Sequence, residues 1–204
     1  MVKQRFLIWW LVVALVISFY GFVQGGSAMK NVVMIIAQDN FRDEELLQPK
    51  TVLQEAGIIV KVASQTQKQA VGMLGARVMP DMTLQDINVQ DFDAVIFVGG
   101  GGSSVYWDDP SAHKIANDAF SANKVIAAIC IAPVTLARAG LLKGRKTTVW
   151  SSEAGKLKAA GAVYTGKSLE RDGNIITASG PTAAIEFGSQ LLKVLSETQT
   201  YGTK

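Results

Sequence analysis

Three short and almost wholly apolar runs, at residues 31–37, 94–98 and 125–129, constrain the fold of this chain more than any other feature. Each run is too short for a buried helix, and each is followed by a connection and then by a segment with helical spacing. Apolar runs without polar alternation are typical of strands that are buried on both faces of a parallel sheet. The sequence therefore predicts an α/β domain with a doubly wound, mostly parallel sheet and helices on both faces.

The same patterns assign the remaining elements and the domain limits. A chain of 204 residues with 49% hydrophobic content has enough apolar material for one substantial core, which we place at 29–197, with a tail at 198–204. Short strands are expected around Gly75 within 69–80, and a hairpin is expected around Asp172 and Gly173. The other expected elements are strands at 58–63, 146–150 and 174–178, and helices at 43–56, 110–122, 133–139, 153–160 and 182–198.

The first 28 residues have the pattern of a signal peptide or a membrane anchor. Lys3 and Arg5 precede an uncharged stretch at 6–23, and small residues follow it. The stretch just reaches the roughly 18 residues of a spanning helix, so we expect an N-terminal hydrophobic helix that would contact the membrane if it is not cleaved. The charge pattern predicts a membrane-anchored or secreted protein with its domain outside the cytoplasm. Translation from Met29 would instead give a cytoplasmic protein.

The charge balance argues against a nucleic-acid partner. Without Lys3 and Arg5, the 20 basic residues of the chain become 18, against 17 acidic residues. Proteins that bind nucleic acid usually carry a marked excess of basic residues on one surface. We therefore expect no nucleic-acid partner.

The single cysteine of the chain, Cys130, stands where the third apolar run ends and a helix begins. Small residues, Ala128 and Ala132, lie two positions before and after it, and Pro133 suits the first turn of a helix. This spacing is typical of a nucleophile elbow, in which a sharp turn lifts the reactive atom above the sheet. The adjacent helix end is expected to favour the thiolate. The alternative is that Cys130 is a small buried hydrophobic residue.

Three loops are expected to meet at the carboxyl edge of the sheet, at 38–45, 99–106 and 130–133. The glycine run in the second loop lacks the Lys of a phosphate-binding loop. We interpret the backbone N–H groups of Gly100 and Ile131 as an oxyanion hole, the alternative being a flexible bend. Further candidates for the pocket around Cys130 are Gly99, Gly101, Tyr106, Trp107 and Trp150.

Glu45 is the candidate partner of the thiol. It lies in the first turns of the helix expected at 43–56, where a carboxylate is most often a solvated complement to the helix dipole. Enclosure beside Cys130 would raise the pKa of the carboxyl, and the protonated acid would then donate a hydrogen bond to the thiolate.

Four ordered motifs carry a resemblance to a known family. They are Phe41-x-Asp43-x-Glu45-Leu46-x-x-Pro49, Val98-Gly99-Gly100, Ala127-Ala128-Ile129-Cys130-x-x-Pro133, and Ser179-Gly180-Pro181 followed by Glu186-Phe187. Over about 29–197 the chain resembles the ThiJ/PfpI superfamily. The resemblance implies a flavodoxin-like fold of the class I glutamine amidotransferase type, a Cys130 nucleophile contacted by Glu45, an oxyanion hole from Gly100 and Ile131, and a homodimer or larger assembly.

The chain departs from this superfamily in its histidines. Members that resemble the PfpI peptidase have His after the cysteine, where this chain has Ile131, and Trp150 stands where others have a nearby His. The only histidine, His113, is expected on a helix surface. These departures argue against a Cys-His-Asp triad and hence against peptide hydrolysis.

The remaining chemistry is that of a thiolate and a carboxylic acid. We expect a glyoxalase- or deglycase-like enzyme that acts on methylglyoxal-type carbonyls or on glycated protein, with Cys130 and Glu45 as catalytic residues and with no metal or organic cofactor. The first alternative is a redox-sensing or chaperone-like stress protein that uses oxidation of Cys130. A cysteine peptidase and an inactive descendant are the others.

Overall fold

The computed structural model describes residues 29–197, and both the hydrophobic helix expected at 6–23 and the tail at 198–204 lie outside the described residues. The main sheet has seven strands in the order β11-β12-β8-β7-β1-β3-β6. Their bounds are β1 (Asn31–Ile35), β3 (Ile59–Ser64), β6 (Met82–Thr83), β7 (Ala94–Phe97), β8 (Val125–Ile129), β11 (Leu169–Asp172) and β12 (Ile175–Ala178).

The five central strands form the flavodoxin-like order. Taken as β3-β1-β7-β8-β12, they are the second, first, third, fourth and fifth strands of a doubly wound sheet, and all of them are parallel. Within the main sheet, only β11 is antiparallel to its neighbour, through the expected hairpin with β12. The chain order reverses between β1 and β7, and loops that leave the carboxyl ends of such strands diverge and leave a crevice. The predicted α/β fold is confirmed.

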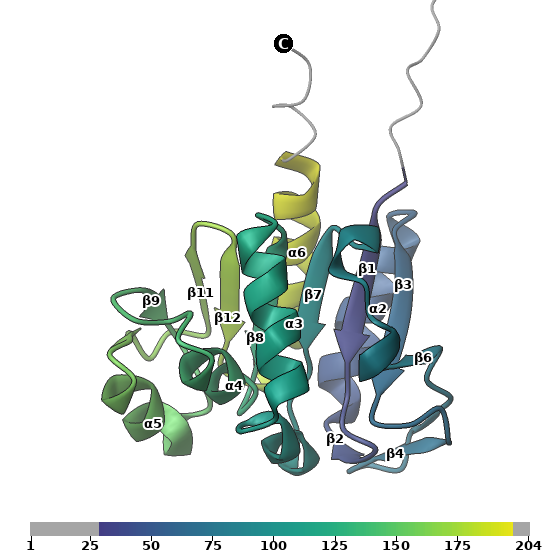
Figure 1. Cartoon of the computed structure of the whole chain (residues 1–204), viewed down its shortest axis with the longest axis horizontal. Coiled ribbons are helices and arrows are strands. Elements are labelled where there is room, and N and C mark those ends of the chain that lie inside the picture. The colour runs from purple at the N-terminus through teal and green to yellow at the C-terminus, as the bar shows by residue number, and fades with distance from the viewer. Residues whose placement is uncertain (1–28, 198–204) are drawn as a thin grey trace, which may run out of the picture.

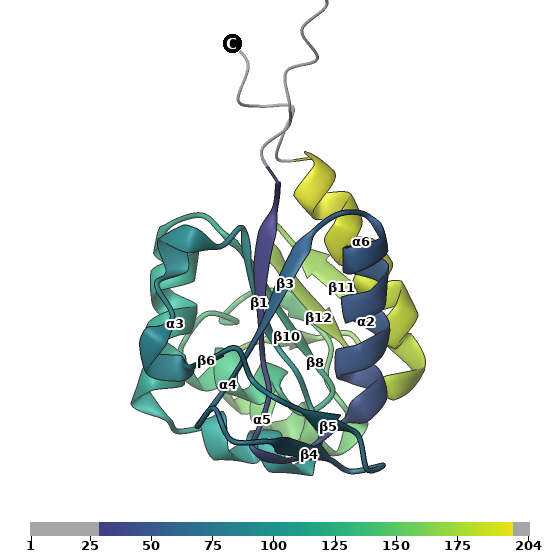
Figure 2. The ribbon, with the colours of Figure 1, turned by 90° about the vertical axis from the view of Figure 1, so that its right-hand side faces the viewer.

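Helices cover both faces of the sheet, as Figure 2 shows from the side. On one face lie α2 (Asp43–Glu55) and α6 (Ala184–Glu197), and on the other α3 (Pro110–Ser121), α4 (Pro133–Arg138) and α5 (Ala154–Ala159) (Figure 1). The apolar runs alternate between the two resulting core layers. Val32, Met34 and Ile36 pack on the side of α2 and α6, whereas Val33 and Ile35 pack on the other. Burial on both faces explains why these runs show no polar alternation.

A small side sheet stands at the carboxyl edge of the main sheet. It contains β2 (Asp39–Phe41), β4 (Ala70–Gly72) and β5 (Arg77–Val78), and Gly75 lies in the turn between the last two, with φ of +96°. Buried Asp43 anchors this turn to the start of α2, since its carboxylate accepts the N–H groups of Leu74 and Ala76 at 2.9 and 2.7 Å. The short strands expected around Gly75 are confirmed, whereas β2 was expected to be loop.

The segment predicted as a strand at 146–150 is mostly irregular. Only β9 (Lys146–Thr147) is a strand, and it pairs with β10 (Val163–Tyr164) in a separate two-stranded sheet. Beyond it, the N–H of Thr148 donates to the hydroxyl of Thr177 at 2.9 Å, and the N–H of Trp150 donates to the carbonyl of Cys130 at 2.8 Å. These contacts draw the backbone away from ladder pairing and toward the cysteine.

Two predicted helix starts are also shifted by short 3-10 turns. The helix expected from 153 begins at Ala154 after the turn Ser151–Glu153, and the helix expected from 182 begins at Ala184 after the turn Pro181–Ala183. The remaining 3-10 segments are Leu84–Asp86, Val89–Asp91 and Gly101–Tyr106.

The predicted location is corrected. Within residues 29–197, no helix combines the length and the apolar character that crossing a bilayer requires. The membrane-anchored or secreted protein expected from the first 28 residues is not upheld, and the helix expected at 6–23 lies outside these described residues.

Candidate active site

Cys130 occupies the sharp turn that its neighbours predict. It follows β8 with φ of +63°, in the left-handed region that residues other than glycine rarely adopt. Its N–H donates to the carbonyl of Ala178 at 2.9 Å, and its carbonyl accepts the N–H of Trp150 at 2.8 Å. The surrounding backbone therefore holds the strained conformation, and such strain is commonly found at functional sites. The thiol is free and only 8% of the residue is exposed.

Glu45 lies on α2 and is fully buried, and it meets Cys130 across Gly99. A Cβ atom at position 99 would be 2.4 Å from Oε2 of Glu45 and 2.5 Å from Cβ of Cys130, so only glycine leaves room for both side chains. Among residues 29–197, neither carboxyl oxygen of Glu45 has a hydrogen-bond partner of standard geometry. A buried carboxyl without such a partner is costly unless it is protonated or serves a function.

The pKa of Glu45 is raised to about 7, and burial is the main cause. Contacts with the Cys130 thiol, the positive charge of Arg42 and the N–H of Gly99 oppose the rise only in part. At neutral pH this carboxyl is therefore poised both to hold and to release a proton.

The pKa of the Cys130 thiol is raised to about 12 by burial and by the negative charge of ionised Glu45. The backbone N–H groups of Gly100 and Ile131 act in the opposite direction. The expectation that the adjacent helix end makes the thiol acidic is wrong, because α4 has only 6 residues and burial outweighs its dipole. A thiolate at this site therefore depends on Glu45 holding the proton.

Gly99 and Gly100 tie two of the three expected loops together. The N–H of Arg42, in the loop after β1, donates to the carbonyl of Gly99, in the loop after β7, at 3.0 Å. Gly100 has φ of +95°, and a Cβ there would lie 2.3 Å from the backbone nitrogen of Arg42. The glycines thus allow the two loops to approach closely. The N–H groups of Gly100 and Ile131, the residues expected to form the oxyanion hole, both interact with the thiol.

The other candidate pocket residues divide between the two faces of the sheet. Tyr106 is buried in the core layer opposite Cys130, and its hydroxyl donates to the carbonyl of Ile36 at 2.8 Å, so the prediction that it lines the pocket is wrong. Gly101 is exposed and begins the 3-10 segment. Trp150 is 46% exposed and its ring packs against Gly180, next to the turn at Cys130.

Trp107, one of the predicted pocket residues, contacts the loop that follows Cys130. Its indole N–H donates to the carbonyl of Ile131 at 3.2 Å. His113, the only histidine of the chain, contacts the carbonyl of Trp107 at 2.8 Å through Nε2. The histidine is thus engaged away from the thiol. Within residues 29–197, no group of three or more His, Cys, Asp or Glu side chains is placed to hold a metal ion.

The raised pKa of Glu45 predicts how stability depends on pH. Between about pH 4.5 and 7 the folded protein keeps a proton that the unfolded chain has released, so the free energy of unfolding falls as pH rises, by about 3 kcal/mol in total. Glu45→Gln removes this loss. The free energy of unfolding is measured in urea at pH 4 and at pH 8. From the lower to the higher pH, the difference between Glu45→Gln and the wild type should shift by about 3 kcal/mol in favour of the variant.

Glu44→Gln is the matched control, because the adjacent carboxylate pairs with Arg42 at 2.8 Å and its pKa is lowered, not raised. Its effect on stability should be small and of opposite sign. If the free energy of unfolding changed with pH in the same way for the wild type and for Glu45→Gln, Glu45 would not be buried as described.

Comparisons with known proteins agree with this fold. Residues 30–194 match the DJ-1/PfpI family, so the matched segment begins after the predicted leader. An uncharacterised protein of Methanocaldococcus jannaschii, MJ0967, is 42% identical over 174 residues, which cover 83% of this chain and 85% of that protein. Deglycase TK1284 of Thermococcus kodakarensis is 31% identical, over 80% of this chain and 98% of its own.

A solved structure shows the same architecture. The ThiJ/PfpI domain protein from Brachyspira murdochii superposes with a TM-score of 0.82 at 30% identity, covering 84% of this chain and 99% of that one. Sequence and fold therefore lead to one assignment: the chain belongs to the DJ-1/PfpI family.

Proposed function

We propose that this protein is a cysteine-dependent glyoxalase- or deglycase-type enzyme that acts on small reactive carbonyls such as methylglyoxal. The observation that carries the proposal is the fully buried Glu45 beside Cys130, with a carboxyl pKa of about 7. Catalysis by proton transfer is most effective when the pKa of the catalytic group lies near the working pH. The name of the deglycase from Thermococcus kodakarensis supports the same class of reaction.

The first step would be transfer of the Cys130 proton to ionised Glu45 and attack of the thiolate sulfur on the aldehyde carbon. The N–H groups of Gly100 and Ile131 would stabilise the oxyanion that forms, and Glu45 would return the proton to give a neutral hemithioacetal. Glu45 would then take the C–H proton of the former aldehyde carbon, giving an enediol, and return it to the neighbouring carbon. The hydroxyl proton of the first carbon passes to the oxygen of the second, and the product is a lactoyl thioester. Water then hydrolyses the thioester and releases lactate and the free thiol, so methylglyoxal and one water give one lactate and one proton.

Peptide hydrolysis is less well supported by the site. A cysteine peptidase needs a group that protonates the leaving amine, usually an imidazole. Position 131 is isoleucine, position 150 is tryptophan, and His113 is engaged with the carbonyl of Trp107. The carbonyl chemistry needs no such proton donor beyond Glu45.

The test is to incubate the purified full-length protein with methylglyoxal, without glutathione or added metal, and to follow lactate. A second assay follows release of methylglyoxal from a modified arginine or lysine amine. We expect catalytic turnover in at least one assay. No turnover in either assay, together with oxidation of Cys130 to the sulfinic acid by peroxide, would replace the proposal with the redox alternative.

A further inference from the structure

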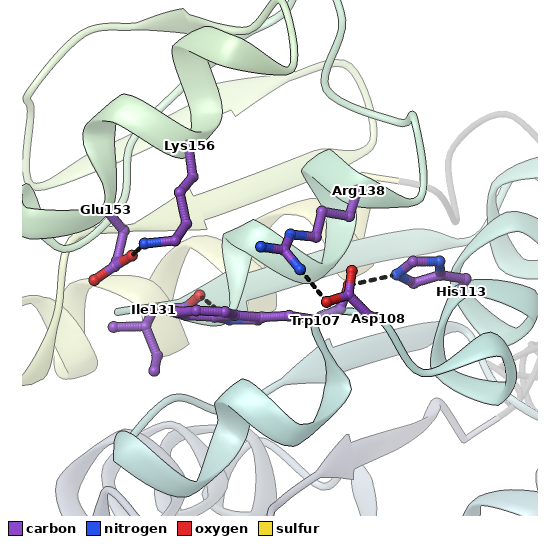
Figure 3. A network of polar contacts seen from close by, with 7 residues as sticks. All are labelled: Trp107, Asp108, His113, Ile131, Arg138, Glu153 and Lys156. Atoms are coloured by element: carbon purple, nitrogen blue, oxygen red, sulfur yellow. Dashed lines mark hydrogen bonds and ion pairs between the residues drawn. The ribbon is translucent and has the colours of Figure 1, made fainter.

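Trp107 stands at the centre of a network of polar contacts that the proposed reaction does not use (Figure 3). It follows the 3-10 segment Gly101–Tyr106, and its indole N–H donates to the carbonyl of Ile131 at 3.2 Å. That carbonyl also accepts the N–H of Val134 at 3.2 Å. Ile131 is thus held through its carbonyl, while its N–H faces the thiol of Cys130.

Two cations hold the indole ring. The guanidinium of Arg138, on α4, lies 5.5 Å from the ring centroid, and Nζ of Lys156, on α5, lies 5.0 Å from it. Figure 3 shows both on the same face of the ring. A cation over the face of an indole is attracted by the negative potential of the ring. Residues from α4 and α5, both distant in sequence from Trp107, therefore restrict the orientation of its ring.

Each cation is itself held by a carboxylate. Arg138 pairs with Asp108, and Lys156 pairs with Glu153 at 2.5 Å. The two pairs cancel in charge, so the network does not offer a free positive site to an anionic ligand. The network instead holds the indole ring of Trp107 in one orientation.

We propose that Trp107 is a positioning residue for the nucleophile turn, and that Arg138 and Lys156 fix its ring so that its N–H holds Ile131 beside Cys130. This inference rests on the proposed function for its catalytic consequence. Donors that stabilise a developing charge act strongly only when they are held in place before the reaction. Loss of the indole N–H would leave Ile131 with one partner fewer and its own N–H less well directed at the sulfur.

The test uses Trp107→Phe, which keeps an aromatic ring under the cations and removes the N–H. The rate of Cys130 alkylation by iodoacetamide at pH 8 should fall about three- to tenfold, in line with the loss of one hydrogen bond. The kcat for methylglyoxal should fall by a similar factor, with KM within about twofold. Alkylation needs no turnover, so it tests the inference even where the proposed function fails.

Lys158→Gln is the matched control. Lys158 lies on α5 like Lys156, but it stacks on Tyr164 at 5.5 Å and not on Trp107. This variant should alkylate at the wild-type rate. A folded Trp107→Phe protein that matches Lys158→Gln in alkylation rate, kcat and KM overturns the proposal.

If circular dichroism shows that Trp107→Phe does not fold, a second variant tests the positioning role of Trp107. Arg138→Gln combined with Lys156→Gln leaves the indole N–H in place and removes both cations. A slower alkylation than that of Lys158→Gln supports the proposal, and an equal rate overturns it.

Discussion

Replacing Cys130 by serine is expected to lower lactate formation from methylglyoxal at least about a thousandfold, as removal of a nucleophile does in other covalent enzymes. The hydroxyl of serine is far less acidic than a thiol. Glu45, with a pKa of about 7, accepts a proton from sulfur much more readily than from such an alcohol. The exchange of one atom leaves the packing of this buried site almost unchanged, so the loss reflects chemistry. The measurement is the initial rate of lactate formation by the two purified proteins.

Circular dichroism and a thermal midpoint close to that of the wild type are the checks on folding for Cys130→Ser. Turnover that persists within about tenfold of the wild type would remove the thiol from the reaction. Cys130 would then not be the nucleophile, whereas the family assignment would stand, because it rests on the match over residues 30–194.

Glu45→Gln is expected to lower kcat for methylglyoxal about a hundred- to a thousandfold, the range typical of a lost general acid–base group. Glutamine fills the same space and offers an N–H donor to sulfur, but it cannot take up and return a proton. The thiol itself is intact and should still react with iodoacetamide at alkaline pH. The variant therefore separates proton transfer from nucleophilicity, and the comparison of kcat with the alkylation rate measures each.

Glu44→Gln is again the control, since Glu44 lies next in the chain and pairs with Arg42. Its kcat should stay within about twofold of the wild type. If Glu45→Gln and Glu44→Gln had equal kcat values, Glu45 would have no part in moving the proton.

The sequence predicted the sheet and the sharp turn at Cys130 because both depend on local patterns, whereas the role of Glu45 followed from the family resemblance. The apolar runs mark β1, β7 and β8 without reference to anything distant. The small residues around Cys130 indicated the turn, and its φ of +63° agrees with that reading. Gly99 and Gly100 were identified by their position after β7, although the reason only glycine fits there is a contact with Glu45 and Arg42 that no local pattern shows.

The directions of two neighbouring aromatic side chains could not be predicted from local patterns. Tyr106 and Trp107 were indistinguishable as pocket candidates, yet one turns into the core to reach Ile36 and the other reaches Ile131. The 3-10 segment Gly101–Tyr106 sets the direction of both side chains, and the ring of Trp107 is then held by Arg138 on α4 and Lys156 on α5. The strand predicted at 146–150 failed for a similar reason, because contacts with Thr177 and Cys130 outweigh the local preference.

The acidity of the Cys130 thiol could not be predicted from the sequence. Sequence reasoning credited the helix that begins at Pro133, but the pKa of Cys130 is set by burial and by the carboxyl of Glu45. Burial is a tertiary property and exceeds the effect of a short helix dipole. The thiol and the carboxyl consequently titrate as a pair, with pKa values that belong to both groups.

The pH dependence of Cys130 alkylation, measured for the wild type and for Glu45→Gln, tests this shared proton most directly. For the wild type we expect the rate to rise through a step near pH 7, where the pair loses its first proton, and then to level off before a second rise at strongly alkaline pH. Glu45→Gln should lack the step near pH 7 and show a single rise. Identical profiles with one alkaline rise in both proteins would contradict the account.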